Sequence, residues 1–253
     1  MAHKFSLLAS VGSDFHCDGR YLADIGINSG DLGSIPSIWS DDPSVKMSQF
    51  FKIHQENPQQ RLIFRLVEIV NHGGVIVYPT DSTYAIGCRI GNKIAKQRIQ
   101  RIRALDPNHK FTVICPNLSS VATYAKVDNI AYRLLRRLTP GPYTFLLPAT
   151  SEVPRLLVDP RRKTIGLRVP SNSIAQALLS ELEDPLMSVT LSFPNRENHL
   201  TEPSDIRLEL ANRVDAVVDG GYCGTSQTTV IDLGEKVPRV IRAGKGDVTL
   251  FEV

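Results

Sequence analysis

The sequence predicts an α/β protein in which one mixed β-sheet forms a single domain behind a short N-terminal extension. Hydrophobic residues make up 42% of the 253 residues and charged residues 22%, an ordinary globular composition that excludes collagen, coiled-coil arrays and disordered chains. Helix and strand patterns alternate in the first part of the chain and then give way to further strands. This order favours a sheet of mixed direction.

The first 46 residues differ from the rest in charge and composition. They hold three basic and six acidic side chains, a net charge of −3, whereas 26 basic and 20 acidic residues follow from Met47 onward, a net charge of +6. Residues 28–46 are rich in Ser, Gly, Asp and Pro and show no helical or strand period. We therefore predict an N-terminal extension over 1–46, ending in a linker, and a domain over 47–253.

The first elements of the domain follow from periodicity and from residues that begin and end helices. Asn57-Pro58 predicts the start of a helix with proline in its first position, and Gly73-Gly74 predicts its end. Residues 75–78 then predict a short buried strand. A second helix is expected from Asn92 to about Ala104, followed by a strand over 111–115.

The second half of the domain is expected to be richer in strands. Asp128 has the side chain of a helix N-cap, and Thr139-Pro140-Gly141 ends the helix that it begins. Two further helices are expected near 173–182 and 203–212. The remaining strands are predicted from short apolar runs over 143–147, 164–169, 186–191, 215–219, 228–233 and 239–242.

Five segments of the domain form a series in one order. They are GGVIVYPTDSTYAIGC (73–88), LTPGPYTFLL (138–147), KTIGLRVPS (163–171), PLMSVTL (185–191) and TTVIDL with PRVIRAGKGDV (228–233 and 238–248). Together they resemble the YrdC/YciO family of threonylcarbamoyl-adenylate synthases, over essentially all of 47–253. NHKF (108–111) and DGGYCGTSQTTVIDL (219–233) are more similar to the YciO branch.

This resemblance implies both a fold and a reaction. The implied fold is a twisted, YrdC-like mixed sheet with a large, positively charged cavity. In the implied reaction, L-threonine, bicarbonate and ATP give threonylcarbamoyl-AMP and pyrophosphate. That product is linked to the threonylcarbamoyladenosine modification of tRNA.

The same resemblance implies a set of site residues. It assigns the YPTDST loop (78–83) to the amino-acid substrate, with Thr80 foremost and with Ser82, Tyr84 and Arg168 beside it. The nucleotide contacts that it implies are Arg103, Lys110, Thr144, Arg168, Thr190, Ser192, Thr228 and Arg242. Without the resemblance, an ordinary aspartate-centred turn capped by Ser and Thr would explain the loop better.

One departure from the family pattern concerns catalysis. Active enzymes of the family carry Lys-x-Arg after the second helix and Ser-x-Asn in a later strand, and the resemblance implies that this tetrad faces ATP. Here Arg103 and Leu105 occupy the first two positions, and Thr190 and Ser192 the other two. We therefore assign the catalytic role to Arg103, Thr190 and Ser192. The change of Arg to Leu removes a phosphate clamp worth roughly 1.5–3 kcal/mol, so weak or altered activity is expected.

The chemistry of this reaction also requires positive charge near the site. An anionic N-carboxy-threonine that attacks the α-phosphate of ATP needs cations around the triphosphate, and Mg²⁺ usually accompanies them. Basic residues cluster over 93–110 and over 133–168, where the alternative for each one is a solvated helix face. Arg168 differs because it lies in an otherwise apolar strand, where an anionic partner is expected.

A second hypothesis is a non-catalytic module that uses the basic cavity to bind structured RNA, such as double-stranded RNA, tRNA or ribosomal RNA. A basic domain favours phosphate contacts, and the sequence shows no evident aromatic stacking platform, which favours duplex over single-strand recognition. Pyrophosphate release that requires both threonine and bicarbonate would separate the two hypotheses.

The N-terminal extension contains a motif of its own. ASVGSDFHCD (9–18) is similar to the closing metal-binding motif of PHP-type phosphoesterases, in which Asp14 and His16 would be ligands. The other ligands of that family are absent from the sequence. We therefore expect no metal site and interpret 1–46 as the remnant of a PHP-type protein.

Cysteine usage and hydropathy bear on the cellular compartment. The four cysteines lie far apart without a C-x-x-C pair, which predicts free thiols in a reducing compartment. No apolar run reaches the roughly 20 residues of a membrane span, and the N-terminus lacks a signal-peptide pattern. We therefore expect a cytoplasmic protein.

Overall fold

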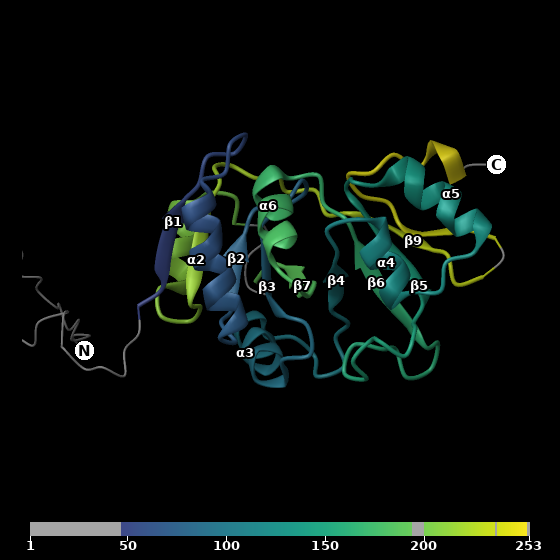
Figure 1. The fold of residues 1–253 in the computed structure, drawn as a ribbon, viewed down its shortest axis with the longest axis horizontal. Coiled ribbons are helices and arrows are strands. Elements are labelled where there is room, and N and C mark those ends of the chain that lie inside the picture. The colour runs from purple at the N-terminus through teal and green to yellow at the C-terminus, as the bar shows by residue number, and fades with distance from the viewer. Residues whose placement is uncertain (1–46, 194–199, 236, 252–253) are drawn as a thin grey trace, which may run out of the picture. The chain divides into compact units, whose positions relative to one another are not determined.

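The computed structural model describes residues 47–193, 200–235 and 237–251. The predicted N-terminal extension, with Asp14 and His16, lies outside the described residues. From Met47 onward the chain forms one compact unit, whose ribbon is shown in Figure 1.

One twisted sheet of ten strands runs through the described residues, in the order β1-β8-β2-β3-β7-β4-β6-β5-β9-β10. The strands are β1 (Gln49–Lys52), β2 (Ile76–Tyr78), β3 (Ala85–Arg89), β4 (Thr112–Ile114), β5 (Tyr143–Pro148), β6 (Thr164–Arg168), β7 (Leu186–Thr190), β8 (Ala216–Asp219), β9 (Thr229–Asp232) and β10 (Arg239–Arg242). Strand β8 runs parallel to β1 and β2, β4 runs parallel to β6, and β5 runs parallel to β9. The other neighbours are antiparallel, so the predicted mixed sheet is confirmed.

Helices cover the sheet and bury its two faces in separate hydrophobic clusters. The helices are α2 (Gln60–Asn71), α3 (Lys93–Arg103), α4 (Leu118–Tyr124), α5 (Asn129–Leu138), α6 (Ser173–Glu181) and α7 (Pro203–Leu210), and a 3₁₀ turn, η2, spans Thr249–Phe251. Helices α2 and α6 share one cluster with Ile76 and Tyr78 of β2, whereas α3, α5 and α7 share the other with Val77. Successive β2 side chains thus alternate between the two faces.

Four helices begin at a residue whose side chain satisfies a free backbone N–H. Asn92, Asn117, Asp128 and Asn172 each accept a hydrogen bond, at 2.8–3.0 Å, from the N–H three residues further on. The predicted helix starts at Asn92 and Asp128 are therefore confirmed.

Two kinds of disagreement separate the predicted elements from the observed ones. The first helix begins at Gln60 instead of Pro58, because the His54 ring accepts hydrogen bonds from the N–H groups of Glu56 and Asn57 and holds this stretch in a turn. Strands β1 and β3 and the short helix α4 were not predicted. Strand β3 directly follows the polar YPTDST loop, and no element was predicted for its residues.

Two further expectations concern thiols and membranes. Cys88, Cys115 and Cys223 are buried free thiols, as predicted, whereas Cys17 lies outside the described residues. In residues 47–193, 200–235 and 237–251, no helix combines the length and the hydropathy that a membrane span requires.

Candidate functional site

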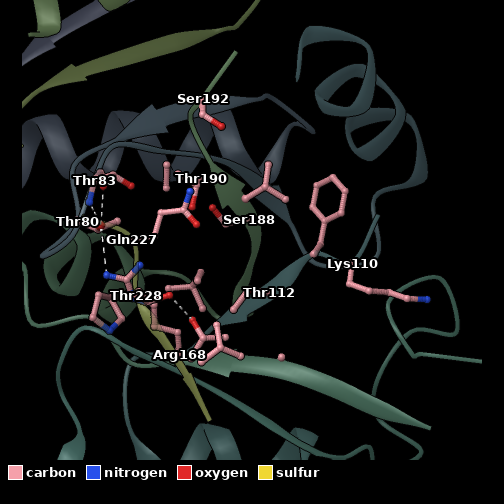
Figure 2. A pocket seen from close by; sticks show the side chains of 18 of the residues that line it. Thr80, Thr83, Lys110, Thr112, Arg168, Ser188, Thr190, Ser192, Gln227 and Thr228 are labelled. Carbon is pink, nitrogen blue, oxygen red and sulfur yellow. Dashed lines mark hydrogen bonds between the residues drawn. The ribbon is translucent and has the colours of Figure 1, made fainter. Parts of the chain in front are cut away.

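Most of the site residues predicted from the sequence meet in one cavity of about 340 Å³. Figure 2 shows this cavity from close by. The predicted residues that line it are Thr80, Arg103, Lys110, Thr144, Arg168, Thr190, Ser192, Thr228 and Arg242. The cavity is therefore lined by cationic and hydroxyl side chains from segments far apart in the chain.

The sheet supplies the floor of the cavity. Thr112 of β4 pairs with Gly166 of β6 and with Ser188 of β7, and Thr144 of β5 pairs with Val230 of β9. All five line the cavity, since directly paired residues project to the same face of a sheet. Gly166 carries no side chain, which leaves room above the centre of this floor.

Thr80 organises the loop that follows β2. Its Oγ1 donates a hydrogen bond to the carbonyl of Thr83 (2.6 Å) and accepts bonds from the N–H groups of Ser82 (3.2 Å) and Thr83 (3.3 Å). Arg168 Nη2 lies 3.3 Å from the same oxygen. The Thr80 hydroxyl is thus occupied by the protein, and the residue shapes the loop more than it offers a free group.

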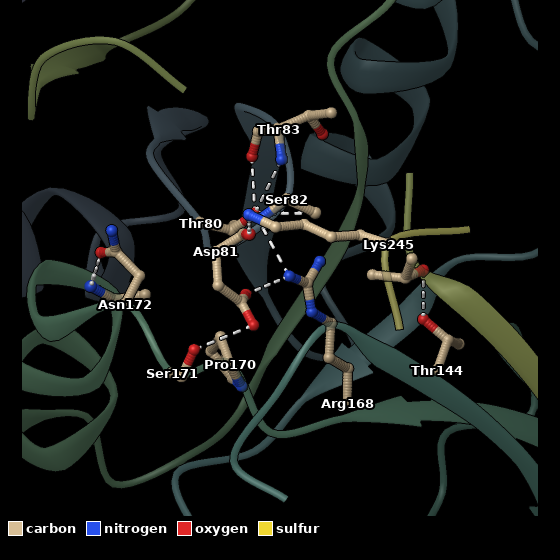
Figure 3. A network of polar contacts seen from close by, with 12 residues as sticks. Thr80, Asp81, Ser82, Thr83, Thr144, Arg168, Pro170, Ser171, Asn172 and Lys245 are labelled. Carbon is tan, nitrogen blue, oxygen red and sulfur yellow. Dashed lines mark hydrogen bonds and ion pairs between the residues drawn. The ribbon is translucent and has the colours of Figure 1, made fainter. Parts of the chain in front are cut away.

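Asp81 is the anionic partner expected for Arg168. The two side chains form an ion pair in which about a tenth or less of each is exposed. Figure 3 shows that Ser171 also donates to the Asp81 carboxylate (3.1 Å) and that Lys245 donates to its backbone carbonyl. The buried Nε of Arg168 has no hydrogen-bond partner among the described residues. One buried donor of this guanidinium therefore lacks a partner within the described protein.

Arg103 is a buried cation without a carboxylate partner. Only 8% of the residue is exposed, and its Nε donates to the carbonyl of Thr190 (2.7 Å). No carboxylate of the described residues lies within ion-pair distance of it, and burial lowers the pKa of its guanidinium. Leu105 packs against the hydrophobic core and is not part of the cavity wall. Arg103 therefore faces the cavity without the second cation of the family pattern.

His109 and Lys110 lie at the edge of the cavity near Arg103. Burial and the charge of Arg103 lower the pKa of His109 below its ordinary value, so its imidazole is neutral at pH 7. Lys110 is half exposed and pairs with Asp159 at 3.5 Å. Figure 2 shows its side chain extending away from the other labelled residues. The predicted nucleotide contact of Lys110 would thus require a change of partner.

Thr144, Thr228 and Arg242 form a third polar group in the wall. The hydroxyls of Thr144 and Thr228 lie 2.9 Å apart, and Arg242 Nη2 donates to the carbonyl of Thr228 (2.9 Å). Burial lowers the pKa of the Arg242 guanidinium, and no carboxylate of the described residues pairs with it. Arg242 is therefore a second cation available to an anionic ligand.

Two predicted substrate residues do not line the cavity. Ser82 is buried, with its hydroxyl 3.1 Å from that of Thr80. Tyr84 is fully buried, and its hydroxyl donates to the carbonyl of Gly221 (2.7 Å) and accepts from the N–H of Gly220 (3.2 Å). Burial raises the pKa of Tyr84. Both residues support the loops around the site, because their hydroxyls are directed into the protein.

Several residues of the site were missed in the sequence. Asp81 and Lys245 belong to the network around Arg168, and Ser188 and Gln227 line the cavity. The rule that a buried arginine needs a carboxylate could have drawn attention to Asp81, because it lies in the loop next to Thr80. No sequence pattern distinguishes Gln227.

The described residues contain no group of three or more His, Cys, Asp or Glu arranged to hold a metal ion. The described cavity wall itself carries no carboxylate. Its chemistry suits a polyanion held by arginines and hydroxyls.

Comparison with known proteins identifies similar chains. The sequence model of the Sua5, yciO and yrdC proteins, described as telomere recombination, matches residues 68–244. The uncharacterized protein YciO of Escherichia coli is 55% identical over 205 residues, which cover 81% of this chain and 100% of that protein. The crystal structure of E. coli YciO matches with a TM-score of 0.77 over the same shares.

More distant relatives have an assigned activity. A threonylcarbamoyl-AMP synthase of Chromobacterium violaceum is 39% identical over 143 residues, which cover 56% of this chain and 73% of that protein. The structure of P. abyssi Sua5 complexed with L-threonine matches with a TM-score of 0.74 at 22% identity, covering 81% of this chain and 60% of that one. At that identity the match shows a shared fold.

Proposed function

The chain belongs to the Sua5/YciO/YrdC family, and on that premise we propose that it is a nucleotidyltransferase that makes threonylcarbamoyl-AMP. Its substrates would be L-threonine, bicarbonate and ATP, and its second product pyrophosphate. The synthases among its relatives support this class of reaction. A link to the threonylcarbamoyladenosine modification of tRNA, in the cytoplasm, belongs to the same proposal.

The observation that carries the proposal is the set of three arginines in one cavity. Arg103 and Arg242 have no carboxylate partner among the described residues, and Arg168 keeps a buried donor unpaired. Guanidinium groups bind phosphate and carboxylate oxygens through paired, charge-assisted hydrogen bonds. A ligand with several negative charges, such as ATP with an amino acid, would satisfy all three.

The proposed chemistry assigns a role to each part of the wall. Arg103, with Thr190 and Ser192, and Arg242, with Thr144 and Thr228, would hold the triphosphate. Arg168 would bind the carboxylate of threonine. The amine of threonine would first form an N–C bond to bicarbonate, with loss of water, to give a carbamate. A carbamate oxygen would then attack the α-phosphorus, forming a new P–O bond while the bond to the β-phosphate breaks and pyrophosphate leaves. Mg²⁺ would arrive with the triphosphate, since the described wall has no carboxylate to hold it.

The experiment is a pyrophosphate assay on the full chain with ATP, L-threonine and bicarbonate. We expect slow release that stops when either threonine or bicarbonate is left out, and a mass spectrum that contains threonylcarbamoyl-AMP. R103M should lower the rate at least tenfold. The matched control R61M, on the exposed part of α2, should leave it unchanged. Release that ignores threonine, or no release at all, would overturn the proposal.

A second candidate function is binding of structured RNA through α5. Arg133, Arg136 and Arg137 are exposed on this helix. None forms an ion pair within 4.0 Å among the described residues, although the charge of Arg137, after hydrogen bonds from Thr249, helps to lower the pKa of Asp247. Such a surface favours contacts with phosphates along a duplex. Binding of tRNA or double-stranded RNA that weakens steeply with salt, and that is lost when all three arginines become glutamate, would support it. Unchanged binding in that variant would exclude it.

A further inference from the structure

Gln227 presents an unused amide to the cavity. Its side chain points into the cavity in Figure 2 and makes no hydrogen bond to the described residues. Its backbone is fixed, because its carbonyl accepts a hydrogen bond from the N–H of Lys245 (2.8 Å) and the hydroxyl of the following Thr228 pairs with Thr144. The backbone of Gln227 is thus held at the wall, and the carbonyl and both N–H donors of its side-chain amide are left for a ligand.

Several hydroxyls of the same wall are already committed to the protein. The Thr80 hydroxyl donates to the carbonyl of Thr83, and the Ser188 hydroxyl donates to the carbonyl of Ile86 (2.9 Å) and accepts from Tyr78 (3.0 Å). The Thr83 hydroxyl donates to the carbonyl of Tyr84 (3.2 Å). The neutral wall side chains that make no hydrogen bond to the described residues are those of Thr112, Thr190, Ser192 and Gln227. Thr190 and Ser192 belong to the proposed triphosphate contacts, and Gln227 is the one amide of the described wall.

The chemistry of the proposed substrate indicates which group that is. The carboxylate of an amino acid and the phosphates of a nucleotide match the arginines. A hydroxyl both donates and accepts a hydrogen bond, and so does a primary amide. We propose that the side-chain amide of Gln227 binds the hydroxyl of the amino-acid substrate and sets the preference for a β-hydroxy amino acid over its aliphatic isostere. This inference rests on the proposed function.

The test compares L-threonine with L-valine, which has a methyl group in place of the hydroxyl. Equilibrium binding of each amino acid is measured by calorimetry on the full chain in the presence of ATP, and pyrophosphate release is measured separately. Q227M keeps the length of the side chain and removes its hydrogen bonds. Q60M removes an exposed amide from α2 and is the matched control. Thermal unfolding verifies that both variants are folded.

In the wild-type protein and in Q60M we expect threonine to bind more tightly than valine. In Q227M this preference should fall by about 10- to 100-fold, through weaker binding of threonine, because a site that pairs with a substrate hydroxyl discriminates strongly against its absence. An unchanged preference in Q227M, or an equal loss of affinity for threonine and valine, would overturn the role of Gln227. Selective, Gln227-dependent binding of threonine without pyrophosphate release would overturn the proposed reaction and leave the role of Gln227 intact.

Discussion

Arg103 holds a positive charge where water hardly reaches it and where no carboxylate of the described residues pairs with it. Burying such a charge lowers the stability of the unliganded protein, because the guanidinium loses its hydration. An anion that binds beside it offsets this desolvation cost. We expect R103M to weaken ATP binding by about 10- to 100-fold, corresponding to roughly 1.5–3 kcal/mol, while the free energy of unfolding stays within about 1 kcal/mol of wild type. Calorimetry and urea unfolding measure the two effects. A variant that is destabilised and still binds ATP normally would show a structural role instead.

The Asp81–Arg168 ion pair should, unlike Arg103, contribute to the stability of the folded protein. In D81N, Arg168 is left as a buried charge without its counter-charge, and we expect a loss of about 3 kcal/mol in the free energy of unfolding. The double variant D81N/R168M should recover most of that loss. D184N is a matched control, because the Arg89–Asp184 pair is about 40% exposed and should contribute less than about 1 kcal/mol. Equal losses in D81N and D184N would contradict this account.

His109 should couple nucleotide binding to proton uptake. Burial and Arg103 lower its pKa in the unliganded protein, against a smaller opposing effect of Asp106, so the ring is neutral near neutral pH. Phosphate placed beside Arg103 would offset that charge and raise the pKa, so ATP binding should take up protons and strengthen as the pH falls towards about 6. Calorimetry of ATP binding in buffers with different ionisation enthalpies measures the uptake. H109Q should abolish it, whereas H72Q, on the exposed end of α2, should not.

At the level of the elements, the cap of α6 also fixes part of the site. The Asn172 side chain accepts a hydrogen bond from the N–H of Ala175 (3.0 Å), and the hydroxyl of the preceding Ser171 donates a hydrogen bond to the Asp81 carboxylate. We expect N172A to lower the free energy of unfolding by about 1 kcal/mol, because it removes one N-cap hydrogen bond. Chemical denaturation measures this loss, and N172D, which keeps an acceptor, should restore most of it. Equal stability of N172A and wild type would mean that water replaces the cap.

The elements that were predicted correctly are those with strong local signals. Asp128 and Asn92 begin helices because their side chains satisfy the free N–H groups, and the apolar runs after Gly141 form strands as expected. Strand β1 was missed because it is short and its pairing partner, β8, lies far along the chain. The helix start predicted at Pro58 was wrong because hydrogen bonds to the His54 ring hold residues 54–57 in a turn, and the helix begins after it.

The sequence could predict which residue types belong to the site, but it could not predict the direction of each side chain. The resemblance identified Arg103, Arg168 and Arg242, and the structure brings them together in one cavity. Tyr84 and Ser82 lie in the same motif as Thr80, and the sequence does not say which hydroxyls are directed into the protein. Gln227 has no local signature, because its proposed role follows from its place in the cavity wall, which depends on the folded chain.

At the level of the whole molecule, the domain should not need the N-terminal extension. E. coli YciO matches this chain over its own full length, in 205 residues. We expect a chain that begins at Met47 to unfold at the same temperature as the full chain and to bind ATP with the same affinity. Calorimetry on both chains decides this. Loss of stability or of ATP binding in the shorter chain would assign a function to residues 1–46.

The spread of the cavity wall along the chain also determines when, during synthesis, the cavity can first form. Its residues run from Thr80 to Arg242, and its floor needs β9 beside β5 and β7 between β3 and β4. Synthesis adds roughly 5–20 residues per second, so the wall is complete only after Arg242 has left the ribosome. A chain that stops before Arg242 therefore lacks part of the wall, and pairing over such long sequence separations makes folding slow. Binding of a ligand in this cavity would therefore require the folded sheet, and it would stabilise the whole domain at once.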